Sequence, residues 1–280
     1  MQSYGTIGHG SQAPKLIEWA EGSIEGDILD KPFGLFLLAA FGNISSSSVS
    51  DSAYTHTFTL QNDSQHDSLT ITLADPDRTD RFGLAMLDSL EITMAADDVV
   101  QYTANFKSRS ARQQPAASPT YTSDYNKFMG RHTVLKLASV VGGLAAATPV
   151  NVSSLTLTIS KNTVVRNALG TVWPDDILNG KFDITGEFEL DLDDQTYRNL
   201  AVDTSYRAMR IQFVNNEVLL GVTSKPSLTI DLAKCYFEAW EPSLANDDFV
   251  SQKVQFRALY DPTTQTIINS VQLINGQATY

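Results

Sequence analysis

The sequence has 280 residues, with 20 basic and 32 acidic side chains and a formal net charge of −12. This acidic balance argues against a general duplex-DNA-binding surface, which needs lysine and arginine to neutralise phosphates. The 42% hydrophobic and 19% charged fractions argue against an intrinsically disordered chain.

The first predicted elements lie near the N-terminus. The stretch "SIEGDI" (23–28) alternates like a strand, and "KPFGLFLLAAFG" (31–42) begins with proline and ends with glycine, as helices often do. Its apolar part, Phe33–Phe41, is about half as long as a membrane span, so no membrane insertion is expected. The serine-rich "NISSSSVSDS" (43–52) predicts a flexible loop, and "THTFTL" (55–60) predicts a strand.

Most of the later elements are predicted strands. The stretches "SLTITL" (68–73), "SLTLTI" (154–159) and "SLTIDL" (227–232) alternate apolar residues with Thr or Asp, which is typical of an antiparallel sheet with one buried face. Residues 107–128 are rich in Ser, Pro, Gln and Ala and predict a linker or a long arm. The stretch "DDQTYRNLAVD" (193–203) predicts a second helix with an aspartate N-cap. The predicted fold class is therefore mainly β, with a short helix in each half.

One predicted strand, residues 181–193 within "NGKFDITGEFELDLDD", carries an unusual number of carboxylates. Successive side chains of a strand point to opposite faces, so the apolar residues share one face and the charged residues share the other. The charged face consists of Lys181, Asp183, Thr185, Glu187, Glu189, Asp191 and Asp193. Like charges along one face repel, so folding alone gives no reason for them.

Related motifs in the two halves predict a tandem duplication. The pattern Ile-x-Gly-acid-apolar occurs at 24–28 and again at 184–188, each time before a predicted helix. Further along, "DDVVQYTANFK" (97–107) matches "DDFVSQKVQFR" (247–257) at fixed spacing. We therefore predict two copies of one β-sandwich or barrel unit, each with a short flanking helix. The predicted domains are residues 1–125 and 126–280.

No motif in the sequence predicts catalysis. The histidines are scattered, and no nucleophile elbow, phosphate-binding loop or zinc-ligand spacing is present. The single cysteine, Cys235, lies in an apolar run and is expected to be a buried thiol. The stretches "DPDRTD" (75–80) and "DLDD" (191–194) lack the glycine and terminal glutamate of a calcium loop, so turn and cap roles are expected. We expect no enzyme activity, no cofactor and no metal site.

Several stretches between about Tyr125 and Gln272 occur in a characteristic order: "NKFMGRHTVLKLAS", "VSSLTLTISKNTVVRNALGTVWPDDILNGKFDITGEFELDLDDQTYRNL", "AMRIQF", "LTIDLAKCYFEAW" and "DDFVSQKVQFRALYD". In the first half, "WAEGSIEGDILDKPFGLFLLAAFG", "YTHTFTL" and "RFGLAMLDSLEITM" accompany them. Together these stretches resemble the tail tube (major tail) proteins of long-tailed bacteriophages and related viruses. The motifs are structural, so the resemblance rests on their order and number.

The resemblance implies a structural virion protein whose copies self-assemble into stacked rings. These rings would form the hollow viral tail tube, a conduit for genome DNA during ejection, with only transient, non-specific passage of that DNA. Its location would be the virion tail, after assembly in the host cytoplasm, and its other partners would be the tape measure, distal tail and terminator proteins. The predicted duplication favours trimeric pseudo-sixfold rings, and hexameric rings are the alternative.

Two sets of residues are predicted sites under this resemblance. A lumen lined with carboxylates repels DNA, so the outward acidic rows of the two related strands are expected to line it. These residues are Glu21, Glu25, Asp27, Asp183, Glu187, Glu189 and Asp191. The alternative is that they face bulk water on the outside of the tube. An inter-subunit arm is expected to include Arg109, Arg112, Tyr121 and Tyr125.

A second class of function fits the same strands and turns. An adhesion or carbohydrate-binding β-sandwich, or a capsid decoration module, is expected to show an exposed aromatic cluster. It is also expected to remain a monomer or a small oligomer, whereas a tube protein forms filaments.

Overall fold

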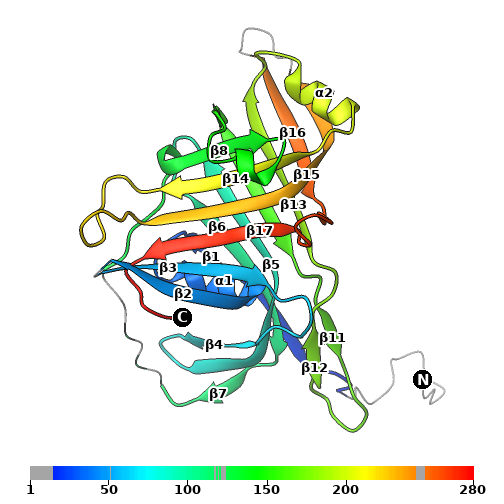
Figure 1. Cartoon of the computed structure of the whole chain (residues 1–280). Helices are drawn as coiled ribbons and strands as arrows, with labels where there is room; N and C mark the ends of the chain where they lie inside the picture. Colours follow the sequence, from blue (N-terminus) through cyan, green and yellow to red (C-terminus); the bar gives the residue numbers. More distant parts are fainter. Residues whose placement is uncertain (1–14, 51, 117, 119, 121–123, 244–249) are drawn as a thin grey trace, which may run out of the picture.

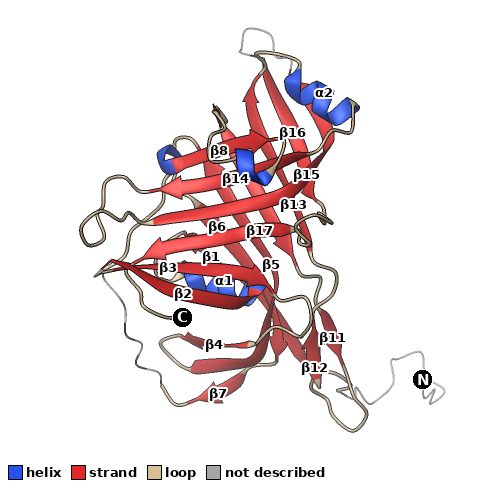
Figure 2. Cartoon of the chain, in the orientation of Figure 1, coloured by secondary structure: helices blue, strands red, loops and turns tan. Residues whose placement is uncertain are grey.

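The computed structural model describes the chain from residue 15 to residue 280, except residues 51, 117, 119, 121–123 and 244–249. Strands make up 55% of the chain and helices 9%, which confirms the predicted mainly β class (Figure 2). Among the described residues, no helix is both long enough and apolar enough to cross a membrane.

The elements of the first half are β1 (Trp19–Asp27), α1 (Phe33–Phe41), β2 (Gly42–Ser50), β3 (Ala53–Leu60), β4 (Leu69–Ala74), β5 (Thr79–Ala95), β6 (Gln101–Arg109) and β7 (Arg112–Gln114). Those of the second half are β8 (Thr133–Ala138), β9 (Pro149–Val150), β10 (Ser154–Ser160), β11 (Val164–Arg166), β12 (Asp176–Leu178), β13 (Asp183–Asp191), α2 (Thr196–Val202), β14 (Arg207–Val214), β15 (Ser227–Ser243), β16 (Ser251–Ala258) and β17 (Ile268–Asn275). Short 3-10 turns occupy Gly130–His132 and Val141–Gly143.

Seven strands form one continuous antiparallel section, which we call the main sheet (Figure 1). Their order is β1-β6-β5-β10-β13-β16-β15, so β10 joins the first half to the second. One face of the main sheet is apolar, because residues that lie opposite each other in paired strands point to the same side. One row across this face consists of Ile24, Ala104, Leu90, Ile159 and Ile184.

A second layer packs on the apolar face of the main sheet. It contains β14, the first half of β15, β17, β3 and β2 in ladder order, so strands from both halves share it. Helix α1 lies over β6, where the Phe36 ring centroid is 4.7 Å from that of Tyr102 and 6.3 Å from that of Phe106. In the second half, the Tyr197 ring of α2 lies 5.7 Å from Phe188 of β13. A single cluster of buried apolar residues runs through both halves.

The hairpins β5–β6 and β15–β16 have the same geometry. Met86 pairs with Lys107, and Tyr236 pairs with Arg257, so both partners are numbered 150 higher in the second hairpin. Each long strand contains one extra residue at the equivalent position, a β-bulge, which lies at Asp88 in β5 and at Glu238 in β15. This correspondence agrees with the tandem duplication, which itself stays a prediction.

The strands β1 and β13 correspond differently from what the sequence motif suggested. The motif aligned Gly26 with Gly186, but pairing with β6 and β16 aligns Asp27 with Asp191, a shift of four residues. Four is an even number, so each side chain keeps its predicted face. The acidic strand is also shorter than expected, spanning Asp183–Asp191 instead of 181–193.

The prediction of a loop at 43–52 was wrong for most of its length. Residues Gly42–Ser50 form β2, which pairs with β3 throughout. A serine run has little strand preference of its own, and the neighbouring strand supplies its backbone partners. The helix prediction was correct, and Gly42 ends α1 with a φ of 84° and an N–H that donates to Leu38 O.

Candidate functional site

All seven carboxylates predicted to line a lumen lie on the polar face of the main sheet, opposite the core. Glu25 shares a row with Thr103, Glu91, Thr158 and Thr185. The next row contains Asp27, Gln101, Thr93, Thr156 and Glu187. Ladder pairing thus brings the acidic rows of the two halves onto one surface, which spans both predicted domains.

Basic side chains from neighbouring strands pair with some of these acids. Lys253 Nζ lies 2.6 Å from Glu187 Oε1, and Arg257 lies 3.5 Å from Asp183 Oδ2. The hydrogen bond with Glu187 raises the pKa of Lys253 above its ordinary value. The sequence does not indicate these partners, although both are in "DDFVSQKVQFR", because the register of β13 against β16 is a long-range property of the fold.

Asp27 also has a basic partner, but this one comes from outside the sheet. Lys127 Nζ donates to Asp27 Oδ2 at 2.6 Å, and this bond raises the pKa of Lys127. Both side chains are well exposed, so the pair stabilises the fold little.

Other carboxylates on the polar face have no ion pair within the described residues. These are Glu21, Glu25, Glu91, Glu189, Asp191 and Glu241. Of these, Glu189 accepts a hydrogen bond from Ser251 Oγ at 2.7 Å. Hydroxyl and amide side chains fill most of the remaining positions, including Thr93, Thr103, Asn105, Thr156 and Thr158. The surface is therefore hydrophilic and carries more negative than positive charge.

Two of the residues predicted for an inter-subunit arm, Arg109 and Arg112, contact other parts of the chain itself. Arg109 is the last residue of β6, and its guanidinium donates to Pro174 O at 3.0 Å and Asp175 O at 3.2 Å. Arg112 in β7 stacks over the Trp173 ring, 4.6 Å from its centroid. Tyr125 is exposed, and Tyr121 lies outside the described residues.

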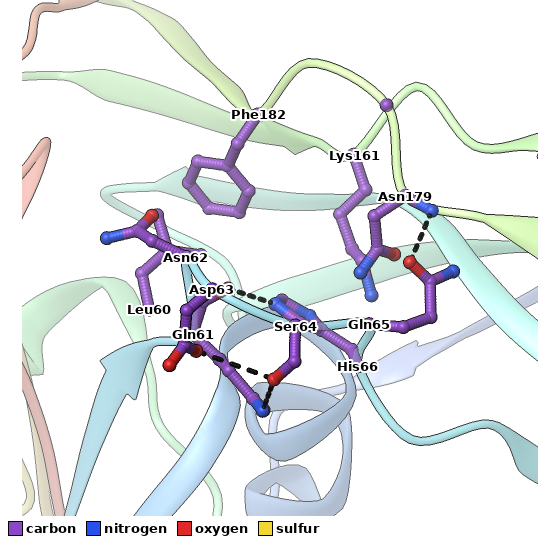
Figure 3. A pocket seen from close by; sticks show the side chains of 11 residues that line it. Leu60, Gln61, Asn62, Asp63, Ser64, Gln65, His66, Lys161, Asn179 and Phe182 are labelled. Carbon is purple, nitrogen blue, oxygen red and sulfur yellow. Dashed lines mark hydrogen bonds between the residues drawn. The ribbon is translucent and has the colours of Figure 1, made fainter.

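A polar pocket of about 400 Å³ lies between the loop 61–66 and the segment after β10 (Figure 3). Lys161 and His66 point toward it, yet both side chains are almost fully buried. Lys161 Nζ donates to Ala39 O at 2.8 Å, in the last turn of α1, and burial lowers the pKa of Lys161 to about 8. His66 Nε2 donates to Gln61 O, and burial, with Lys161 nearby, lowers the pKa of His66. These contacts hold the end of α1 against the second half, a structural role.

The acidic motifs considered for calcium serve as turns and caps, as expected. Asp75 Oδ1 accepts the backbone N–H groups of Asp77 and Arg78. Asp194 accepts the backbone N–H and the hydroxyl of Thr196, the first residue of α2, although the N-cap position is Gln195 and not the predicted aspartate. No group of three or more potential metal ligands is found among the described residues. Cys235 is fully buried, and burial raises the pKa of its thiol.

Comparison with known proteins gives one match and one negative result. A family model described as phage tail tube protein matches residues 14–258 of the 280-residue chain. No curated protein matches the chain. The match covers β1 to β16, and therefore includes every strand of the main sheet.

Proposed function

Because the chain belongs to the phage tail tube protein family, we propose that its copies self-assemble into stacked rings that form a hollow tail tube. The tube conducts genome DNA during ejection, with the polar face of the main sheet lining the lumen. The observation that carries this proposal is the continuous sheet that places the acidic rows of both halves on one face, away from the core.

The chemistry of the polar face suits the passage of a polyanion. Carboxylates without ion pairs, such as Glu25 and Asp191, repel phosphates that come within about 8 Å, the screening length at physiological salt. Hydroxyl and amide groups keep the wall wet without fixed positive charge. The pairs Lys253–Glu187 and Lys127–Asp27 neutralise bases that would otherwise hold DNA.

The repeated hairpin supports rings of three chains with pseudo-sixfold symmetry, with rings of six as the alternative. Each chain presents two bulged hairpins, related by 150 residues, in one sheet. Three such chains place six equivalent hairpins around the lumen. The two predicted domains, 1–125 and 126–280, are the two tube units of this proposal.

The proposed setting is the virion tail, following assembly in the host cytoplasm. Proposed partners beyond the chain itself are the tape measure, distal tail and terminator proteins of the same tail. No catalytic step is part of this function, and DNA passes without specific binding.

Electron microscopy of the purified protein at several salt concentrations tests the proposal. Hollow filaments are the expected result, and end-on class averages distinguish three chains per ring from six. A protein that stays monomeric in all conditions and binds glycans would instead support the adhesion alternative.

A further inference from the structure

The junction between the two halves shows how the bulge in β5 receives a neighbouring strand. Strand β10 pairs with Ser89–Ala95, on the edge of β5 opposite β6. The Asp88 carboxylate accepts hydrogen bonds from the Thr163 backbone N–H at 2.8 Å and from the Thr163 hydroxyl. The Asp88 backbone carbonyl accepts the Lys161 N–H at 2.8 Å. The bulge is therefore an anchoring point for the segment that follows β10.

The equivalent place in β15 has no strand paired to it, although α2 also packs against β15. Glu238 forms an ion pair with Arg257 at 2.8 Å, just as Asp88 does with Lys107 at 2.9 Å. Strand β14 pairs with β15 no further than Cys235, and β16 occupies the other edge. Within the described part of the chain, residues 236–243 therefore have one unpaired edge, and the Glu238 side chain is 37% exposed.

Pro242 protects this unpaired edge. Its counterpart in β5 is Ile92. The Ala96 N–H donates to Ser153 O on the β10 side, and every second N–H along a strand points to the same edge, so the Ile92 N–H also points toward β10. The Pro242 nitrogen therefore faces the empty edge and offers no donor. Proline at an edge is a common device against indiscriminate strand pairing, so the edge accepts only a partner that other contacts position.

A second incomplete surface lies at the other end of the molecule, at β1. Among the described residues, β1 pairs with β6 only. Beneath its free edge is an apolar groove of about 140 Å³ between β1, β4 and β6, lined by Gly22, Ile24, Ile71, Phe82 and Phe106. Leu73 on its rim is 56% exposed. In the second half the same opening is closed, because β10 pairs with β13 and β8 with β14.

We propose that these two surfaces form one head-to-tail interface with a second copy of this chain. The bulged edge of β15 in one copy docks at the free edge of β1, and at the groove beneath it, in the next copy. The internal model for this contact is the junction where β5 pairs with β10 and β10 pairs with β13. The β15–β16 tip and β4 lie at opposite ends of the molecule (Figure 1). A contact between two different surfaces is heterologous and generates a ring if the rotation closes. The inference rests on the proposed tube function and names the surfaces that build its rings.

Paired cysteines test the interface. Glu21 and Glu241 are exposed and have no role in the core, so Glu21→Cys and Glu241→Cys should leave folding intact. In assembled tubes, the double variant treated with a short bismaleimide should give covalent oligomers that end at the ring number. Each single variant should assemble into tubes but give no covalent oligomers, because a heterologous contact does not bring a residue against its own copy in the next chain. The native Cys235 is buried and should not react.

The outcomes separate this inference from the proposed function. If tubes form but the double variant does not crosslink, the proposed interface is wrong and the tube function is unaffected. Crosslinking of either single variant would have the same meaning. Failure of the unmodified chain to assemble overturns both. As a matched pair, Glu238→Gln should raise the protein concentration needed for assembly about tenfold without changing monomer stability. By contrast, Asp88→Asn should destabilise the monomer.

Discussion

Asp88 ties three segments of the fold together through one carboxylate oxygen. Its Oδ1 accepts hydrogen bonds from Lys107 Nζ in β6 at 2.9 Å and from the Thr163 N–H after β10 at 2.8 Å. Burial alone would raise the pKa of Asp88, but the bonds from Thr163 and Lys107 outweigh it and lower the pKa overall. Nothing in "MLDSLEI" distinguishes this aspartate in the sequence, because its partners lie far away along the chain.

Asp88→Asn is expected to lower the free energy of unfolding by about 2 kcal/mol, the usual value for hydrogen bonds to a charged group. Because folding lowers the Asp88 pKa, its contribution is present above the unfolded value of about 3.9 and is lost as pH falls through the lower folded value. Urea unfolding of both proteins from pH 7 downward measures this. Asp203→Asn, at an exposed position, is the control, and equal losses in the two variants would contradict the role of Asp88.

Lys161 gives a second prediction, in the alkaline pH range. Burial lowers its folded pKa to about 8, so between pH 8 and the ordinary lysine value of 10.5 the unfolded chain binds more protons than the folded one. Stability from this group therefore rises with pH across that range. At about 1.36 kcal/mol per pKa unit, wild type should gain about 2.5 kcal/mol over Lys161→Met between pH 7 and pH 10. Tyrosine ionisation affects both proteins equally and cancels when their free energies of unfolding are subtracted. A difference that stays constant from pH 7 to pH 10 would contradict the lowered pKa of Lys161.

At the scale of elements, alternation in the sequence located the strands well but not their partners. The pattern in "SLTLTI" placed β10 correctly, and nothing local indicated that it would join β5 to β13. The alternation in β13 gave the correct face for each carboxylate, but its pairing with β16, which adds Lys253 and Arg257, is a long-range property. The error at β2 has the same origin, since β3 and not the serine run specifies that strand.

The two motif glycines, which the sequence treated as equivalent, should respond differently to substitution. A Cβ at Gly186 would lie 2.5 Å from the Phe256 ring and 2.5 Å from Thr156 O, whereas one at Gly26 would meet the Tyr102 ring at an ordinary 3.6 Å. We expect Gly186→Ala to cost about 2 kcal/mol, because a backbone carbonyl must move. Gly26→Ala should be neutral or slightly stabilising. Thermal unfolding of both variants checks this, and equal costs would favour the motif alignment over the strand register.

At the scale of the whole molecule, many of the acidic side chains gather on one surface. A net charge of −12 could have served solubility alone. The main sheet instead collects carboxylates from β1, β5, β13 and β15 on the face opposite the core. That face crosses the junction between the halves without interruption, so a ring of copies would present one continuous acidic wall. Whether that wall faces the lumen or the outside decides its use, and charge reversal distinguishes the two.

Replacing Glu91, Glu189 and Asp191 with lysine should leave tube assembly intact, because these residues lie in β5 and β13, away from the two edges of the proposed interface, and have no ion pair in the described part of the chain. If the polar face lines the lumen, the added positive charges attract passing phosphates, so DNA ejection from virions that carry the variant should slow. The delay should shrink at high salt, where screening and counterions weaken phosphate contacts. The control reverses three exposed acids away from this face, Asp67, Asp77 and Asp203, and so makes the same change in net charge. Slower ejection in the control, with normal ejection in the first variant, would place the acidic rows of the main sheet on the outer wall.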